Sequence, residues 1–180
     1  MQSKHALSTG KYLWIFCTLL CSLLASGCKN YSVSVNDNLV YVPPSIFKDY
    51  TIADQRLFDC VEQTIYDKKI TRAEDLTSLN CSNAAIKSLK GLEKFFALKE
   101  LNLAENQIDD IATLAMLGRL ENLKLNGNQI KDATALLNLL HLKQLDLQEN
   151  DQLNCKSLQQ VVTNLTKTAA QVLAPEQCIN

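Results

Sequence analysis

The sequence predicts an α/β repeat fold: a short solenoid with parallel strands on its concave face and 3₁₀ or irregular segments on its convex side. Three observations lead to this prediction. Apolar residues recur with a period of 22 through residues 76–153, patterns typical of helices stand before and after that stretch, and four cysteines fall two near each end. Both open ends of a solenoid need covering, so we expect helical N- and C-terminal caps.

Length and composition indicate one ordinary domain with a leader. The chain has 180 residues, of which 47% are hydrophobic and 21% charged, so a packed core is expected rather than disorder. A formal net charge of -1 leaves no basic stripe for phosphates, which argues against a nucleic-acid partner.

The first 27 residues have the features of a signal peptide. Lys4 and Lys11 make the start basic, and an apolar run of about 14 residues extends from Tyr12 to Ala25. This run is too short to cross a hydrocarbon core of ~30 Å but suits a secretory leader. It ends in the sequence Leu24-Ala25-Ser26-Gly27-Cys28.

Small residues before a cysteine resemble the lipobox of bacterial lipoproteins, although Ala25 stands where leucine is commonest. The resemblance implies cleavage before Cys28 and acylation of that cysteine, for example with palmitate, which would anchor the chain in a membrane. Lys29 follows in place of aspartate, which in Gram-negative sorting implies an outer-membrane lipoprotein, here expected to face the periplasm. The alternative is ordinary secretion with a free Cys28.

Between the leader and the solenoid we predict a tether and a cap. Residues 28–50 are polar and contain Pro43-Pro44, so we interpret them as a tether, although their valines leave open an added strand or packing on the domain. Residues 51–75 form the predicted N-terminal cap, and residues 154–180 the C-terminal cap. Helical spacing supports both caps, through Leu57, Cys60, Val61, Thr64 and Ile65 in the first and Leu158, Val161, Val162 and Leu165 in the second.

The repeat itself reads L-x-x-L-x-L-x-x-N-x-I, followed by further apolar positions three apart. Alternate leucines of LxL lie on one side of a short strand, and the residues between them face water. Each asparagine stands where the chain turns inward, so its amide is expected to satisfy backbone groups of neighbouring coils. This structural ladder consists of Asn106, Asn128 and Asn150.

The pattern resembles the 22-residue leucine-rich repeats of the internalin-like kind, over residues 76–153. The helical stretch before it resembles the N-terminal cap of such domains. The resemblance implies a binding module, but it names no ligand, because function on this fold is grafted onto variable faces.

The four cysteines outside the leader and the lipobox are expected to form disulfides within each cap region. Cys60 and Cys81 lie near one end of the solenoid, Cys155 and Cys178 near the other, and the two ends are far apart. An exported chain favours such bridges, each closing a loop of roughly 20 residues and contributing about 3 kcal/mol. The alternative is four buried free thiols, since Cys81 occupies an inward leucine column.

We find no pattern for catalysis, a cofactor or a metal, and predict that the protein is not an enzyme. His141 has no orienting acid or nucleophile near it in the sequence and is interpreted as a surface histidine. Glu105, Asp109, Asp110 and Asp132 could suggest a calcium site, but we interpret acids at this column as contacting backbone or solvent.

The outward face of the sheet is the candidate binding surface, because its residues stack into rows one coil apart. It carries none of the aromatic or arginine side chains that usually dominate protein-binding hot spots, so a merely solvated face is the alternative. Other candidate docking surfaces are the Tyr31–Tyr50 segment and the cap around Phe58 and Tyr66. The candidate partner-binding residues are Lys99, Glu100, Asn102, Glu121, Asn122, Lys124, Lys143, Gln144 and Asp146.

Together these features predict a lipid-anchored cell-envelope module that binds an envelope protein, or a glycan, through its leucine-rich-repeat surface. A structural component of an outer-membrane assembly and a surface adhesin are the alternatives.

Overall fold

The computed structural model describes residues 33–35, 38–41, 46–166 and 169–179. The predicted signal peptide, Cys28 and parts of the tether lie outside these residues, so cleavage and lipidation stay predictions. Within the described residues, no helix combines the length and apolar character needed to cross a bilayer.

The chain divides into two compact units, Met1–Pro44 and Ser45–Asn180. In the first unit, strand β1 (Val33–Val35) pairs with β2 (Asn38–Tyr41) in an antiparallel hairpin. The sequence left open that the valines of this segment add a strand; in the structure the two strands pair with each other.

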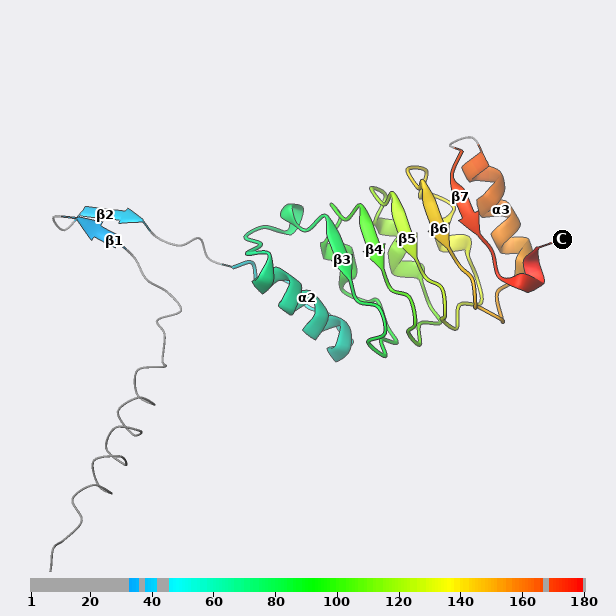
Figure 1. The fold of residues 1–180 in the computed structure, drawn as a ribbon, viewed down its shortest axis with the longest axis horizontal. Coiled ribbons are helices and arrows are strands. Elements are labelled where there is room, and N and C mark those ends of the chain that lie inside the picture. The colour runs from blue at the N-terminus through cyan, green and yellow to red at the C-terminus, as the bar shows by residue number, and fades with distance from the viewer. Residues whose placement is uncertain (1–32, 36–37, 42–45, 167–168, 180) are drawn as a thin grey trace, which may run out of the picture. The chain divides into compact units, whose positions relative to one another are not determined.

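The second unit is a solenoid built on a five-stranded parallel sheet, with its strands in chain order (Figure 1). Short 3₁₀ turns form the return segments. This arrangement confirms the predicted α/β repeat fold. The strands are β3 (Ser78–Asn80), β4 (Glu100–Asn102), β5 (Asn122–Lys124), β6 (Gln144–Asp146) and β7 (Gln171–Leu173); the 3₁₀ turns are η1 (Ala73–Asp75), η2 (Leu92–Lys94), η3 (Ala112–Met116), η4 (Thr134–Leu136) and η6 (Glu176–Cys178).

The repeat period sets the register of the sheet. Leu79 pairs with Leu101, Leu101 with Leu123, and Leu123 with Leu145. These four leucines are at most 2% exposed, whereas the residues on either side of each point outward. Stacking therefore buries one leucine per strand beneath a polar surface, because no coil has enough partners to bury its own.

The asparagine ladder ties each coil to the one before it. Asn128 Oδ1 accepts a hydrogen bond from Ile108 N at 3.0 Å, and its Nδ2 donates to Leu103 O at 2.9 Å and Leu125 O at 3.0 Å. Asn106 and Asn150 make the equivalent bonds one coil earlier and one coil later. All three side chains are buried, so one amide satisfies backbone groups that water cannot reach.

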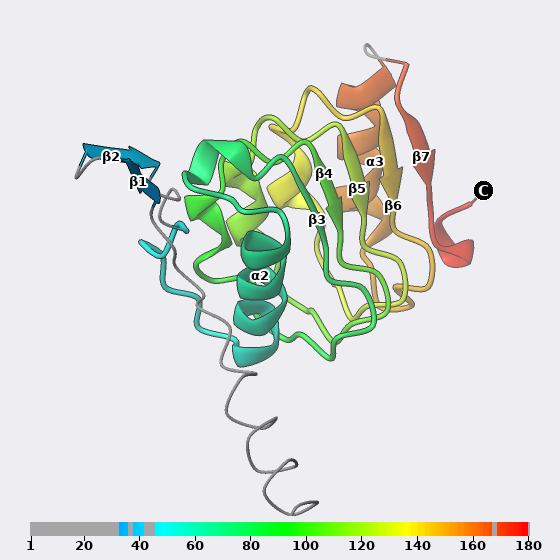
Figure 2. The same ribbon diagram turned by 60° about the vertical axis from the view of Figure 1, so that its left-hand side comes forward.

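Helix α2 (Gln55–Asp67) covers the β3 end of the sheet (Figure 2). Leu57, Val61 and Ile65 recur four residues apart and are all buried against the core. A disulfide joins Cys60 of this helix to Cys81 of the first coil, with 5.9 Å between the Cα atoms. The N-terminal cap is thus held by packing and by a covalent bond.

Asp54 joins the cap to the first coil through a single carboxylate. Its Oδ1 caps the helix by accepting from Arg56 N at 2.9 Å and Leu57 N at 3.2 Å. Its Oδ2 accepts from Lys87 N at 2.8 Å and Ser88 N at 3.2 Å. Burial opposes ionisation of this carboxyl, but the four backbone donors outweigh it and the pKa of Asp54 is lowered from 3.8.

Residues 46–50, which the sequence assigns to the tether, pack on the solenoid. The Tyr50 and Phe47 rings lie 5.3 Å and 6.1 Å from the fully buried ring of Phe95. Phe47 N donates to Ile70 O at 2.9 Å. The aromatic rings bury apolar surface that a solvated tether would leave exposed, so this stretch functions as part of the cap.

The C-terminal cap contains both a helix and a strand. Helix α3 (Cys155–Leu165) packs beside η4 in the place of a return segment, and Ser157 Oγ accepts from Ala133 N at 3.1 Å. Strand β7 then adds to the sheet beside β6 (Figure 1), an element that the sequence does not predict. A disulfide joins Cys155 to Cys178, with 5.2 Å between the Cα atoms. Pairing within each cap is therefore what the structure shows.

Replacing Asn128 by alanine will lower the free energy of unfolding by about 3 kcal/mol, because it leaves buried N–H and C=O groups in two coils without partners. Urea unfolding followed by circular dichroism measures this. The exposed neighbour Gln129, replaced by alanine, is the control and will change stability by less than about 0.5 kcal/mol. Equal effects of the two substitutions would contradict the role given to the ladder.

Replacing Asp54 by alanine will cost about 2 kcal/mol, the scale of a lost helix cap plus hydrogen bonds to a second segment. Because the folded-state pKa of Asp54 is lowered, its contribution is complete above the ordinary value of 3.8 and is lost as the pH falls through the folded-state pKa. The stability difference between wild type and variant should therefore narrow on acidification. Asp59→Ala, on the exposed side of the same helix, is the control, and a difference that does not change with pH would refute this mechanism.

Candidate binding surface

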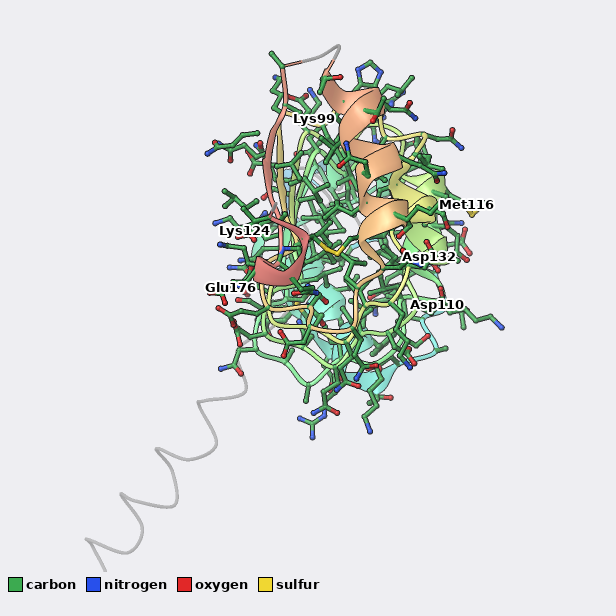
Figure 3. All side chains as sticks on the ribbon, turned by 90° about the vertical axis from the view of Figure 1, so that its right-hand side faces the viewer. Lys99, Asp110, Met116, Lys124, Asp132 and Glu176 are labelled. Carbon is green, nitrogen blue, oxygen red and sulfur yellow. A yellow bond between two sulfur atoms is a disulfide. The ribbon has the colours of Figure 1, made fainter. Side chains whose placement is uncertain are left out.

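The outward face of the sheet presents polar side chains in rows across the coils. The row of Glu100, Asn122 and Gln144 is aligned by strand pairing, and the row of Asn102, Lys124 and Asp146 lies two residues further along each strand. Lys124 projects from the sheet side of the solenoid in Figure 3. The structure therefore brings six of the predicted partner-binding residues together on one surface.

The remaining three predicted residues form a charged row at the amino ends of the strands. Glu121 lies between two lysines: its Oε1 is 3.5 Å from Lys99 Nζ, and its Oε2 accepts a hydrogen bond from Lys143 Nζ. The hydrogen bond from Lys143, with a smaller effect of Lys99, lowers the pKa of the Glu121 carboxyl from 4.5. Glu121 is therefore ionised at neutral pH, and the row alternates in charge.

An open hollow of about 290 Å³ lies along this row, lined by Lys99, Arg119, Glu121, His141 and Lys143. We call this side of the solenoid the amino edge of the sheet; Figure 3 shows Lys99 there. The sequence did not group Arg119 and His141 with the others. The available signal was their position 22 residues apart, two residues before Glu121 and Lys143.

Side chains typical of protein-binding hot spots occur beside this edge. The Arg119 guanidinium carbon lies 5.8 Å from the centre of the Phe96 ring, and 43% of Phe96 is exposed. Leu140 is also exposed, and Met116 projects on the convex side in Figure 3. The aromatic and arginine groups that the sheet face lacks are thus supplied by the segments that lead into the strands.

The aspartates that occupy one column of the repeat, which could have suggested a calcium site, contact the backbone. Asp110 Oδ1 accepts from Ala112 N, and Asp132 Oδ1 accepts from Thr134 N, each at 2.8 Å. In the described part of the chain, no group of three or more histidine, cysteine, aspartate or glutamate side chains is arranged to hold a metal ion.

The aromatic residues of the N-terminal cap mostly serve its core. Phe47, Tyr50 and Phe58 are partly buried, and the ring centres of Tyr50 and Phe58 are 5.8 Å apart. Tyr66 is exposed. Of these four aromatic residues, Tyr66 alone is exposed and available to a partner.

These features define a leucine-rich-repeat domain, a fold typical of binding modules without enzymatic activity. More narrowly, the chain belongs to the family described as the leucine-rich-repeat domain of the endo-beta-N-acetylglucosaminidase EndoS, whose model matches residues 52–167. The endo-beta-N-acetylglucosaminidase activity named in that description is the activity of EndoS. No curated protein matches the chain.

Solved internalins have similar structures. Internalin InlF of Listeria monocytogenes str. 4b F2365 is 26% identical with a TM-score of 0.56, over 68% of this chain and 43% of that one. Internalin C2 of the same strain is 20% identical with a TM-score of 0.58, over 73% of this chain and 70% of that one, and supports the fold alone. This chain thus spans less than half the length of InlF. The similarity indicates a protein-interaction module in general terms.

Proposed function

We propose that this protein is a lipid-anchored module of the cell envelope that binds a protein partner through the outward face of its sheet. The observation that carries the proposal is that each of the strands β3 to β6 has one buried leucine, which belongs to the core, and outward residues, which do not. Leu101, Leu123 and Leu145 are buried, whereas the residues that flank them are exposed or half-buried and belong to no core cluster. The leucine core does not include these outward side chains, so they can differ in kind without loss of that core. Asn102 and Asp146 also accept hydrogen bonds from Ala104 N and Gln148 N, which holds these two side chains in place.

Recognition on this face would be largely polar. One row carries a single negative charge, that of Glu100, and the other carries both signs, with Lys124 beside Asp146. Charges arranged in this way favour specificity and fast association over affinity, and their effect weakens as salt screens them. A protein partner with complementary charges fits this face better than an apolar one.

The envelope location rests on the leader and the disulfides. Two bridges close the caps, and disulfides persist in oxidising compartments such as the periplasm. Acylation of Cys28 would then hold the domain at the outer membrane, facing the periplasm. A glycan ligand, a structural role in an outer-membrane assembly and surface display as an adhesin are the outcomes against which the proposal is tested.

The binding face can be tested with the full chain by photo-crosslinking. A photoreactive amino acid at position 124 should link the protein to one discrete partner, and the same group at position 131, on a return segment, should not. The triple variant Glu100→Ala, Lys124→Ala, Gln144→Ala should reduce binding more than about 10-fold while changing stability little, as exposed positions do. The control triple variant Lys87→Ala, Gln129→Ala, Lys131→Ala should bind normally, and equal losses in both would overturn the assignment of the face.

The anchor is tested separately by the intact mass of the protein extracted from membranes. The expected species begins at Cys28, carries acyl chains, and shows four thiols only after reduction. Protease treatment of intact cells distinguishes the two sides of the membrane: protection supports the periplasmic side, and digestion supports an adhesin instead. A chain without lipid would overturn the anchored form of the proposal and leave the binding face to be judged by crosslinking.

A further inference from the structure

We propose that the hollow at the amino edge of the sheet binds an oxyanion, a phosphate or carboxylate group carried by a ligand. The inference rests on the proposed function in one respect: it treats this edge as an end of the binding face. Anion binding at the hollow can nevertheless be measured without any protein partner.

The site is built by the stacking of the coils. Lys99, Glu121 and Lys143 occupy one column in three successive coils, and their backbones are joined by hydrogen bonds of 2.8 Å from Glu121 N to Lys99 O and 2.7 Å from Lys143 N to Glu121 O. Arg119 and His141 come from the column two residues earlier. The backbone hydrogen bonds that join neighbouring coils therefore also set the spacing of these side chains.

Positive charge exceeds negative charge in the hollow. Three cations, Lys99, Arg119 and Lys143, line the hollow together with one carboxylate, that of Glu121, so the lysine, arginine and glutamate side chains leave a formal surplus of two positive charges. The chain as a whole has a formal charge of -1. The surplus is therefore local, and it would attract an anion to this edge.

The donors of the hollow are free to bind a ligand. Both lysines contact Glu121, yet their side chains are 56% and 70% exposed, and an ammonium group has three donors. Among the described residues, Arg119 has no carboxylate partner. Its guanidinium carbon lies 5.8 Å from the centre of the Phe96 ring, and Arg119 is exposed, so solvent and a dissolved anion can reach this side chain.

The geometry of these donors selects the chemistry of the ligand. A guanidinium group binds two oxygens of a phosphate or carboxylate at once, and a nearby ammonium group adds a point charge. The exposed Phe96 ring, together with Leu140 beside His141, gives apolar surface for the rest of such a ligand. Glu121 competes with the ligand for both lysines, so an anion must bind against its charge.

The test is an NMR titration of the full chain in a non-ionic detergent, at constant ionic strength, with inorganic phosphate and separately with glucuronate. Saturable shifts of the Arg119 Nε–H and of the amides near Glu121 and Lys143 are expected, with a dissociation constant in the millimolar range, about 5 mM. Tighter binding of phosphate would indicate that the ligand carries a phosphate group, and tighter binding of glucuronate that it carries a carboxylate. The absence of saturable shifts with both anions up to about 50 mM would overturn the proposal.

Two variants with opposite expected effects make the test specific. Arg119→Ala should weaken anion binding at least about 10-fold, whereas Glu121→Gln should strengthen it about 3-fold because it removes the competing charge. Lys131→Ala removes an exposed cation from a return segment, outside both the hollow and the binding face, and should leave anion binding unchanged. Weaker binding by Glu121→Gln, or an equal loss in Lys131→Ala and Arg119→Ala, would show that the hollow is not the site. Partner crosslinking at position 124 is read independently, so the two proposals can fail separately.

Discussion

The stack of coils depends on the burial of backbone groups where each strand ends and the chain turns inward. Such groups cost free energy unless they are hydrogen-bonded, and no regular secondary structure reaches them at this point. The asparagine side chains resolve this, since each amide accepts from an N–H of the preceding coil and donates to carbonyls of both coils. Leucine burial supplies the driving force, and the asparagines determine that neighbouring coils meet in one register.

That register also organises the surface. Because each coil repeats its predecessor at the spacing of adjacent strands, side chains of one column form a straight row. The row of Lys99, Glu121 and Lys143 becomes a charged strip in this way, although those residues are far apart in the sequence. A domain built on this principle can vary its outward residues without disturbing its core, which explains how one fold serves different partners.

The sequence predicts most of the fold because the repeat encodes it directly. The leucine columns, the asparagine ladder, both cap helices and the pairing of cysteines follow from period, spacing and position. Strand β7 could not be predicted, since Gln171–Leu173 lacks the repeat signature. It follows α3 in the chain and joins the sheet by pairing with β6. The packing of Phe47 and Tyr50 on Phe95 was missed for a similar reason: nothing in a polar segment shows which distant ring it will cover. Arg119 and His141 were not grouped with the charged row, because their column holds the buried Ala97 one coil earlier and residue type does not repeat there.

The most direct measurement of the central claim is native-state hydrogen exchange of the amides that the asparagines hold. Ile86, Ile108 and Ile130 each donate to the side chain of an asparagine one coil further on. If the ladder determines the stacking, these amides exchange only through global unfolding, as slowly as the most protected amides of the sheet. Exchange of Ile108 through local opening, much faster than that of the sheet, would show that the coils stay stacked without the asparagines and would contradict the claim.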